Sequence, residues 1–124
     1  MTYTGCVAFL PVTVVEVEPF PSKSARVWSE EELLEFISFI ANHPEAGDVI
    51  VGGEGIRKVR WKRSGAGKRG GVRVIYYFHD ASLPLFLLTV YPKSRKEDLS
   101  NNELKAMSKL VTRLRSTYAE PKGA

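Results

Sequence analysis

Three short β-type segments joined by two short linkers constrain the fold of this chain more than any other feature. Residues 56–62, 72–79 and 85–91 are rich in β-branched and aromatic side chains, which favour strands. The linkers between them are RSGAGKRGG and DASLP. A parallel connection needs roughly a dozen residues or more, usually as a helix. We therefore predict that the three strands are antiparallel neighbours.

Two helices flank this meander, and each begins with a capping signal. Ser29 and Glu32, like Ser100 and Glu103, have the spacing of a capping box. The first helix is expected to end near Asn42, because the next residue precedes a proline. Apolar residues follow each cap at helical spacing: Leu33, Phe36, Ile37 and Ile40, then Leu104, Met107, Val111 and Leu114.

The N-terminal part of the chain adds one more strand. Residues 12–17 (VTVVEV) favour a strand, and Pro19 and Pro21 stop the pattern. Residues 22–27 are expected to form a loop or a short helical turn, and residues 1–11 a disordered extension or an extra strand. The resulting order, β-α-β-β-β-α, indicates an α+β fold in a single domain, residues 1–124, with a core of about residues 12–118.

Cysteine content and hydropathy exclude several classes of site. Cys6 is the only cysteine, so the chain has neither an internal disulfide nor a cysteine cluster for a metal. This fits a reduced, cytoplasmic setting. No apolar run approaches the roughly 18 residues that span a bilayer. We expect no membrane association, no cofactor and no metal requirement.

Positive charge gathers in one stretch of the chain, whose net charge is +4. No acidic residue interrupts this stretch, which is the electrostatic footprint of a polyanion site. A solvated basic face would give the same composition. The basic residues of the stretch are Arg57, Lys58, Arg60, Lys62, Arg63, Lys68, Arg69 and Arg73.

The alternation of side chains along strands sorts these residues by face. Lys58, Arg60 and Lys62 share one face of the first strand, and Val59 and Trp61 point toward the core. In the second strand, Val72, Val74, Tyr76 and Phe78 lie opposite Arg73, Ile75, Tyr77 and His79. In the third, Phe86, Leu88 and Val90 are assigned to the core face, and Thr89, Tyr91 and the following Lys93 to the other.

The antiparallel arrangement brings strand ends together. Arg60, Lys62, Arg73, Tyr91 and Lys93 should converge at one end of the sheet and on one face. Burying unpaired cations is costly, so we predict an open, concave surface for phosphate. The adjoining loop GAGKRGG lacks the GxxxxGK[ST] order of a nucleotide-binding loop and is interpreted as a flexible hairpin that can grip a backbone.

The central sequence resembles a known family. The stretch GIRKVRWKRSGAGKRGGVRVIYYFHD, followed by FLLTVYPKSRKEDLS, is similar to the RelE/HigB toxins of bacterial type II toxin–antitoxin systems. The preceding NHPEAGDVI resembles the HigB-like branch, and the match covers about residues 29–118. The resemblance implies a microbial-RNase-like fold, a small antiparallel sheet with helices packed on one face. It also implies ribosome-dependent mRNA cleavage, in which a ribose 2′-hydroxyl attacks the adjacent phosphate.

The resemblance assigns functional positions to Lys58, Arg60, Arg73 and Lys93. Some relatives carry a tyrosine, proposed as the base, where this chain has Leu99 or a close neighbour; Tyr91 is the candidate substitute. The two arginines suit bidentate phosphate binding. The identity of the general base and acid stays open between the lysines and the tyrosine. The remaining basic residues are assigned to RNA binding: Arg57, Lys62, Arg63, Lys68 and Arg69.

The implied partners are a cognate antitoxin, expected to be a helix-turn-helix protein, and the ribosome with its mRNA. Operator DNA is expected to bind only through the antitoxin complex. Three alternatives remain: a ParE-like toxin that poisons gyrase, a non-catalytic nucleic-acid-binding module, and a toxin that has lost activity. The intact basic set argues against the gyrase poison.

The remaining histidines and tryptophans are given structural roles. His43 is expected to cap a helix end. His79 lies at the far end of its strand, roughly 20 Å from Arg73 by the strand rise, which argues against catalysis. Trp28 and Trp61 are interpreted as core anchors.

Overall fold

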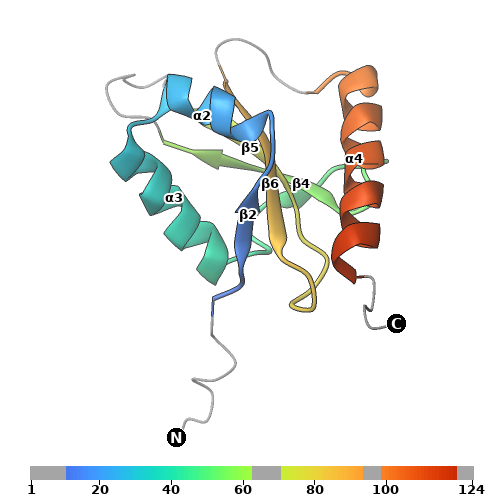
Figure 1. The fold of residues 1–124 in the computed structure, drawn as a ribbon. Helices are drawn as coiled ribbons and strands as arrows, with labels where there is room; N and C mark the ends of the chain where they lie inside the picture. The colour runs from blue at the N-terminus through green and yellow to red at the C-terminus, as the bar shows by residue number, and fades with distance from the viewer. Residues whose placement is uncertain (1–10, 63–70, 94–98, 120–124) are drawn as a thin grey trace, which may run out of the picture.

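One five-stranded sheet organises the molecule (Figure 1). The computed structural model describes residues 11–62, 71–93 and 99–119. The strand order in the sheet is β2-β6-β5-β4-β3. Within the described ranges, no helix is long and apolar enough to cross a membrane. In chain order the elements are β2 (Val14–Glu16), α2 (Phe20–Val27), α3 (Glu30–Asn42), β3 (Asp48–Val49), β4 (Ile56–Trp61), β5 (Val72–Tyr77), β6 (Leu85–Pro92) and α4 (Asn101–Ala119).

The predicted meander is confirmed, because β4 pairs antiparallel with β5 and β5 pairs antiparallel with β6. Two further pairings extend it. β3 is an edge strand antiparallel to β4, and β2 lies parallel to β6 at the other edge. The sheet is therefore mixed rather than purely antiparallel. A parallel pairing is possible here because helices and other strands, rather than a tight turn, separate β2 from β6 along the chain.

Local capping explains where the two long helices begin. The Ser29 hydroxyl accepts a hydrogen bond from the Glu32 N–H at 3.1 Å, and the Ser29 N–H donates to the Glu32 carboxylate at 2.8 Å. Ser100 and Glu103 make the same reciprocal pair at the start of α4. Both capping boxes are confirmed. So is the end of α3 at Asn42.

Of the two structures expected for residues 22–27, a loop or a short helical turn, the helical one forms, and it extends to the eight-residue helix α2. Pro21 lies in its first turn, where backbone N–H groups have no partner within the helix, so the missing N–H of a proline costs no helical hydrogen bond. Phe20 and Ser24 are buried, and the Phe20 ring meets the edge of Trp28 at 6.4 Å. Tertiary packing therefore stabilises a helix that the local proline content argued against.

Helices cover both faces of the sheet, which corrects the expectation of helices on one face. The cluster on one face joins β5 and β6 to α2 and α3 through Phe20, Trp28, Phe36 and Ile40. The cluster on the other face includes Ile75 and the α4 residue Val111. In Figure 1, α4 stands on the opposite side of the sheet from α2 and α3. Every residue of β5 is buried, as expected for a strand covered on both faces.

A bulge in β6 changes which side chains share a face. Ile75 pairs with Thr89, but the next residue, Tyr76, pairs with Leu87, so Leu88 is the extra residue. Phe86 and Leu88 consequently pack with the α4 cluster, whereas Val90 packs with the α2–α3 cluster. The prediction that these three share a core face was therefore wrong, because strict alternation does not hold across a bulge.

Candidate functional site

Two arginines and a tyrosine form a row across the three central strands. Arg60 of β4 pairs with Arg73 of β5, and Arg73 pairs with Tyr91 of β6. Directly paired residues of an antiparallel sheet have Cβ atoms about 4.5–5.5 Å apart on one face. Arg73 and Tyr91 are only 8% and 6% exposed, whereas Arg60 is exposed. The row thus runs from a buried phenol to an open guanidinium.

A second row lies two residues further along β4. Asp48 of β3 pairs with Lys58, and Lys58 pairs with Ile75. Lys58 and Arg60 therefore share the face that Arg73 and Tyr91 occupy. A cleft of about 510 Å³ opens over part of these two rows and does not extend to Tyr91 or Ile75. It is lined by Ala46, Asp48, Lys58, Val59, Arg60 and Arg73.

Lys62 and Lys93 follow the last residues of β4 and β6 at the same end of the sheet. The Lys93 N–H donates to the Gly71 carbonyl at 3.1 Å, and Trp61 pairs with Val72, so Gly71 lies between the two lysines. The Lys62 ammonium lies 5.9 Å from the centroid of the Trp61 ring. Arg63, Lys68 and Arg69, also assigned to RNA binding, lie outside the described residues.

Arg57 lies on the opposite face from Lys58 and Arg60, because it pairs with Tyr76 of the α2–α3 cluster. Its Nη1 atom donates to the carbonyls of Gly47 at 2.8 Å and Glu45 at 3.3 Å. Its Nε is buried. The side chain assigned to RNA binding therefore contacts the loop before β3 instead of lining the cleft.

Tyr76 forms hydrogen bonds to the same loop from the α2–α3 face. Its hydroxyl donates to the Pro44 carbonyl and accepts from the Gly47 N–H, each at 2.8 Å. Burial raises the pKa of this phenol, and the hydrogen bond from Gly47 opposes the shift in part. A Cβ on Gly47 would lie 2.7 Å from the Lys58 carbonyl and 2.9 Å from the Tyr76 ring. Only glycine allows the loop to approach so closely, and β3 begins at the next residue.

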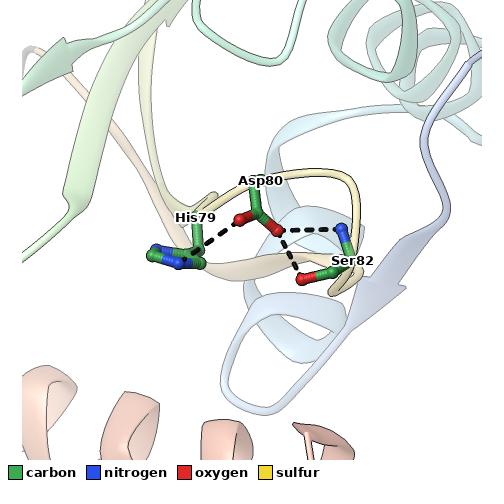
Figure 2. Close-up of polar contacts among 3 residues, drawn as sticks. All are labelled: His79, Asp80 and Ser82. Atoms are coloured by element: carbon green, nitrogen blue, oxygen red, sulfur yellow. Dashed lines mark hydrogen bonds and ion pairs between the residues drawn. The ribbon is translucent and has the colours of Figure 1, made fainter.

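The two histidines lie away from the cleft. His79 follows β5 at the end opposite Arg73, and Figure 2 shows its ring beside Asp80, with Nε2 3.4 Å from the carboxylate. The side chain and the N–H of Ser82 donate to that carboxylate and hold the pKa of Asp80 below its ordinary value. His43 is the C-cap of α3 and stacks on Phe39 at 4.9 Å.

Both tryptophans anchor the α2–α3 face, as predicted. Trp28 stacks on Phe36 at 5.3 Å, and its Nε1 donates to the Lys62 carbonyl at 3.0 Å. Trp61 meets the edge of Phe36 at 5.4 Å. This packing fixes the end of β4, which carries Arg60. Leu99, at the position where some relatives carry a tyrosine, packs against the α4 cluster.

Asp48 is the charged residue of the described cleft lining that the sequence analysis did not single out. Its only signal is its place after a Gly in the connection before β4. The strand that carries it has two residues and depends on pairing with β4, so periodicity could not reveal it. Across the described ranges, no three His, Cys, Asp or Glu side chains are grouped so that they could hold a metal.

The arrangement suits a phosphodiester better than a small neutral ligand. Guanidinium groups bind phosphate oxygens through paired N–H donors. A partly buried guanidinium also interacts more strongly with an anion, because the local dielectric constant is lower than in water. A model of the family described as the RelE toxin of the RelE/RelB toxin–antitoxin system matches residues 22–121 of the 124-residue chain. The matched segment contains every residue that lines the cleft.

Proposed function

We propose that this chain, which belongs to the RelE toxin family, cleaves messenger RNA on the ribosome. As a RelE toxin it is one half of a toxin–antitoxin module, and a cognate antitoxin is its partner. The observation that carries the proposal is that Lys58, Arg60 and Arg73 line one open cleft, with Tyr91 next to Arg73 in the row. We expect the protein to act in the cytoplasm, where it meets translating ribosomes.

The proposed reaction is transesterification. The ribose 2′-oxygen attacks the adjacent phosphorus, the bond to the 5′-oxygen breaks, and a 2′,3′-cyclic phosphate and a 5′-hydroxyl result. Negative charge develops on the phosphoryl oxygens in the transition state. Arg73 and Arg60 would stabilise that charge, and such preorganised donors contribute several kcal/mol to catalysis. Arg73 is the better fixed of the two, because most of its side chain is buried.

The neighbouring groups have supporting roles in this proposal. Lys58 and Lys93 are candidates to donate the proton that the 5′-oxygen needs. Tyr91, at the buried end of the row and outside the cleft lining, would support the position of Arg73, with which it pairs. Lys62, together with Arg63, Lys68 and Arg69, would bind backbone phosphates. Arg57 is left out of this set, since its Nη1 donates to loop carbonyls.

Ribosome-dependent cleavage is tested directly with purified toxin, programmed ribosomes and a defined mRNA. We expect cleavage within the ribosome-bound codon, ends of the two types named above, and no product from the same mRNA without ribosomes. Arg73→Ala is the control that should give no product. Growth inhibition by the toxin with no cleaved mRNA would contradict the proposal, and a gyrase supercoiling assay would then test the ParE-like alternative.

The antitoxin is proposed to be a helix-turn-helix protein through which the complex binds operator DNA. Sequencing the adjacent reading frame and co-purifying its product with this chain tests the partner. A DNA shift with the complex, and none with the toxin alone, is the expected result.

A further inference from the structure

Among the described residues that line the cleft, one is a carboxylate, and the others are cations or small or apolar residues. Asp48 opens β3 and pairs directly with Lys58, so the two side chains leave the same face of the sheet. Asp48 is exposed and lines the cleft. The charged groups that face it there are Lys58 and Arg60 of β4 and Arg73 of β5.

The placement of Asp48 depends on buried contacts on the other face of the sheet. Gly47, immediately before it, donates its N–H to the Tyr76 hydroxyl and gives its carbonyl to Arg57. The Gly47 Cα packs too closely against β4 and Tyr76 to accept a side chain. An exposed edge residue is thus held by a rigid support, which is what a preorganised functional group requires.

The reaction proposed above needs a group that takes the proton of the 2′-hydroxyl. An arginine keeps its proton under all conditions that proteins meet, and a lysine ammonium has no lone pair to offer. The Tyr91 phenol is not among the groups that line the cleft. A carboxylate is ionised at neutral pH and accepts protons and hydrogen bonds. Among the side chains that line the cleft in the described part of the chain, Asp48 alone has this property.

We propose that Asp48 is the proton acceptor of the cleft, an assignment that rests on the proposed function. The 2′-hydroxyl gives its proton to the Asp48 carboxylate as its oxygen bonds to phosphorus. The bond between phosphorus and the 5′-oxygen then breaks, and this oxygen takes a proton from a lysine ammonium of the site. The carboxylic acid afterwards returns its proton to the neutral lysine or to water, so the charges balance.

A carboxylate that only repels phosphate would leave a different signature. Removing a negative charge from a cationic cleft strengthens RNA binding, because fewer like charges oppose the backbone. Asp48→Asn therefore separates the two roles. Loss of a proton acceptor slows cleavage while binding stays equal or tightens, whereas loss of simple repulsion tightens binding and leaves cleavage equal or faster.

The experiment compares Asp48→Asn, Asp48→Glu and the matched control Glu45→Gln, which removes the same charge from the same loop outside the cleft lining. Single-turnover cleavage is measured on ribosomes, and binding is measured with a single-stranded RNA blocked by 2′-O-methyl groups. We expect Asp48→Asn to cleave about a hundredfold or more slowly, the range for lost general base catalysis. Asp48→Glu should recover part of the rate, and Glu45→Gln should behave as wild type.

A rescue experiment separates chemistry from structure. Asp48→Ala supplied with formate should regain cleavage, because a small carboxylate can occupy the vacated position, and Arg73→Ala should not respond. Wild-type cleavage by Asp48→Asn, equal slowing in Glu45→Gln, or loss of both binding and cleavage without formate rescue would each overturn the assignment. If the wild-type toxin itself yields no cleavage, the proposed function fails with it; normal wild-type cleavage with an unaffected Asp48→Asn removes the Asp48 assignment alone.

Discussion

The two faces of the central sheet are formed by the same strands but differ in the residues that they present and in their roles. On the α2–α3 face, β5 presents Val72, Val74 and Tyr76, all fully buried. On the α4 face, Ile75 and Tyr77 are buried in the same way, but Arg73 takes the end position of the strand. One face serves stability along its whole length, whereas the other divides its length between packing and a charged cleft. Substitutions on the two faces should therefore fail in different assays.

The largest effect on stability is expected on the α2–α3 face. Phe36 is fully buried between Trp28 and Trp61. Phe36→Ala should lower the free energy of unfolding by about 3–5 kcal/mol, the usual range for a deleted core aromatic. Urea unfolding measures the change. If the folded fraction of this variant cleaves mRNA more slowly than wild type, the α2–α3 face does not serve stability alone.

The largest effect on activity is expected on the other face. Arg73→Ala should reduce cleavage about 10²–10³-fold or more, the range for removing one donor to a developing oxyanion. Because the side chain is buried, the variant should also lose roughly 1–2 kcal/mol of stability through lost packing of the arginine stem. Val74→Ala is the matched control, because Val74 is the next residue and lies on the other face. This variant should be less stable but should cleave at an unchanged rate per folded molecule. Arg73→Ala that inhibits growth at the wild-type level would refute the site.

An intermediate effect is expected for the contact that joins the two faces. Tyr76→Phe removes the hydroxyl that bonds Gly47 and Pro44 and should cost about 1–3 kcal/mol, because a buried donor and acceptor lose their partner. If the loop places Asp48, cleavage should fall as well, by less than in Asp48→Asn. If Tyr76→Phe loses the expected stability but cleaves at the wild-type rate, the hydrogen bonds of Tyr76 to the loop are not needed to place Asp48.

The same tyrosine sets a dependence on pH. Burial raises the pKa of Tyr76 above its ordinary value of 10.0, and that of Tyr77 likewise. The unfolded chain therefore releases these protons at lower pH than the folded chain does. Their contribution to stability is fully present below pH 10.0 and declines as the pH rises through the folded-state values. Thermal unfolding between pH 9 and 11, on wild type and Tyr76→Phe, measures how much of this decline Tyr76 causes.

The smallest effect on the free toxin is expected on the outer surface of α3. Glu31, Leu34 and Glu35 are exposed there, away from the cleft. We predict that the antitoxin docks on this acidic surface and blocks ribosome entry by bulk, leaving Arg60 and Arg73 open. Glu31→Lys with Glu35→Lys should change stability by no more than about 0.5 kcal/mol and weaken the complex. Hydrogen-exchange protection centred on residues 58–73 and 91–93 would instead indicate direct masking.

Local signals predicted the parts of the fold that depend on neighbours in the sequence. The capping boxes at Ser29 and Ser100 involve residues three apart, and both are present. The row of Arg60, Arg73 and Tyr91 follows from alternation and from linkers too short to cross over. These features need no knowledge of the tertiary structure.

Features that depend on partners distant in the sequence were missed. Helix α2 is longer than the loop or short helical turn that was expected, because Phe20 packs into the core formed with β5 and β6, although prolines flank and enter the helix. The two residues of β3, Asp48 among them, are a strand only because β4 pairs with them. The buried position of Arg73 depends on both neighbouring strands at once. The apolar residues of β5 fall on both faces of the strand, and this pattern indicates a sheet that is covered on both faces.

The extra residue at Leu88 makes β6 two short strands set one step out of phase. Residues 85–87 follow one alternation, and residues 89–92 follow the other. Deleting Leu88 would restore a single alternation and leave Tyr91 on the face of the arginines, because Leu87 and Thr89 already pair with the consecutive residues Tyr76 and Ile75. The row therefore depends on the pairs on either side of the bulge and not on the extra residue itself. A deletion of Leu88 should therefore keep the row of Arg60, Arg73 and Tyr91 and remove only the packing of one aliphatic side chain against the α4 cluster.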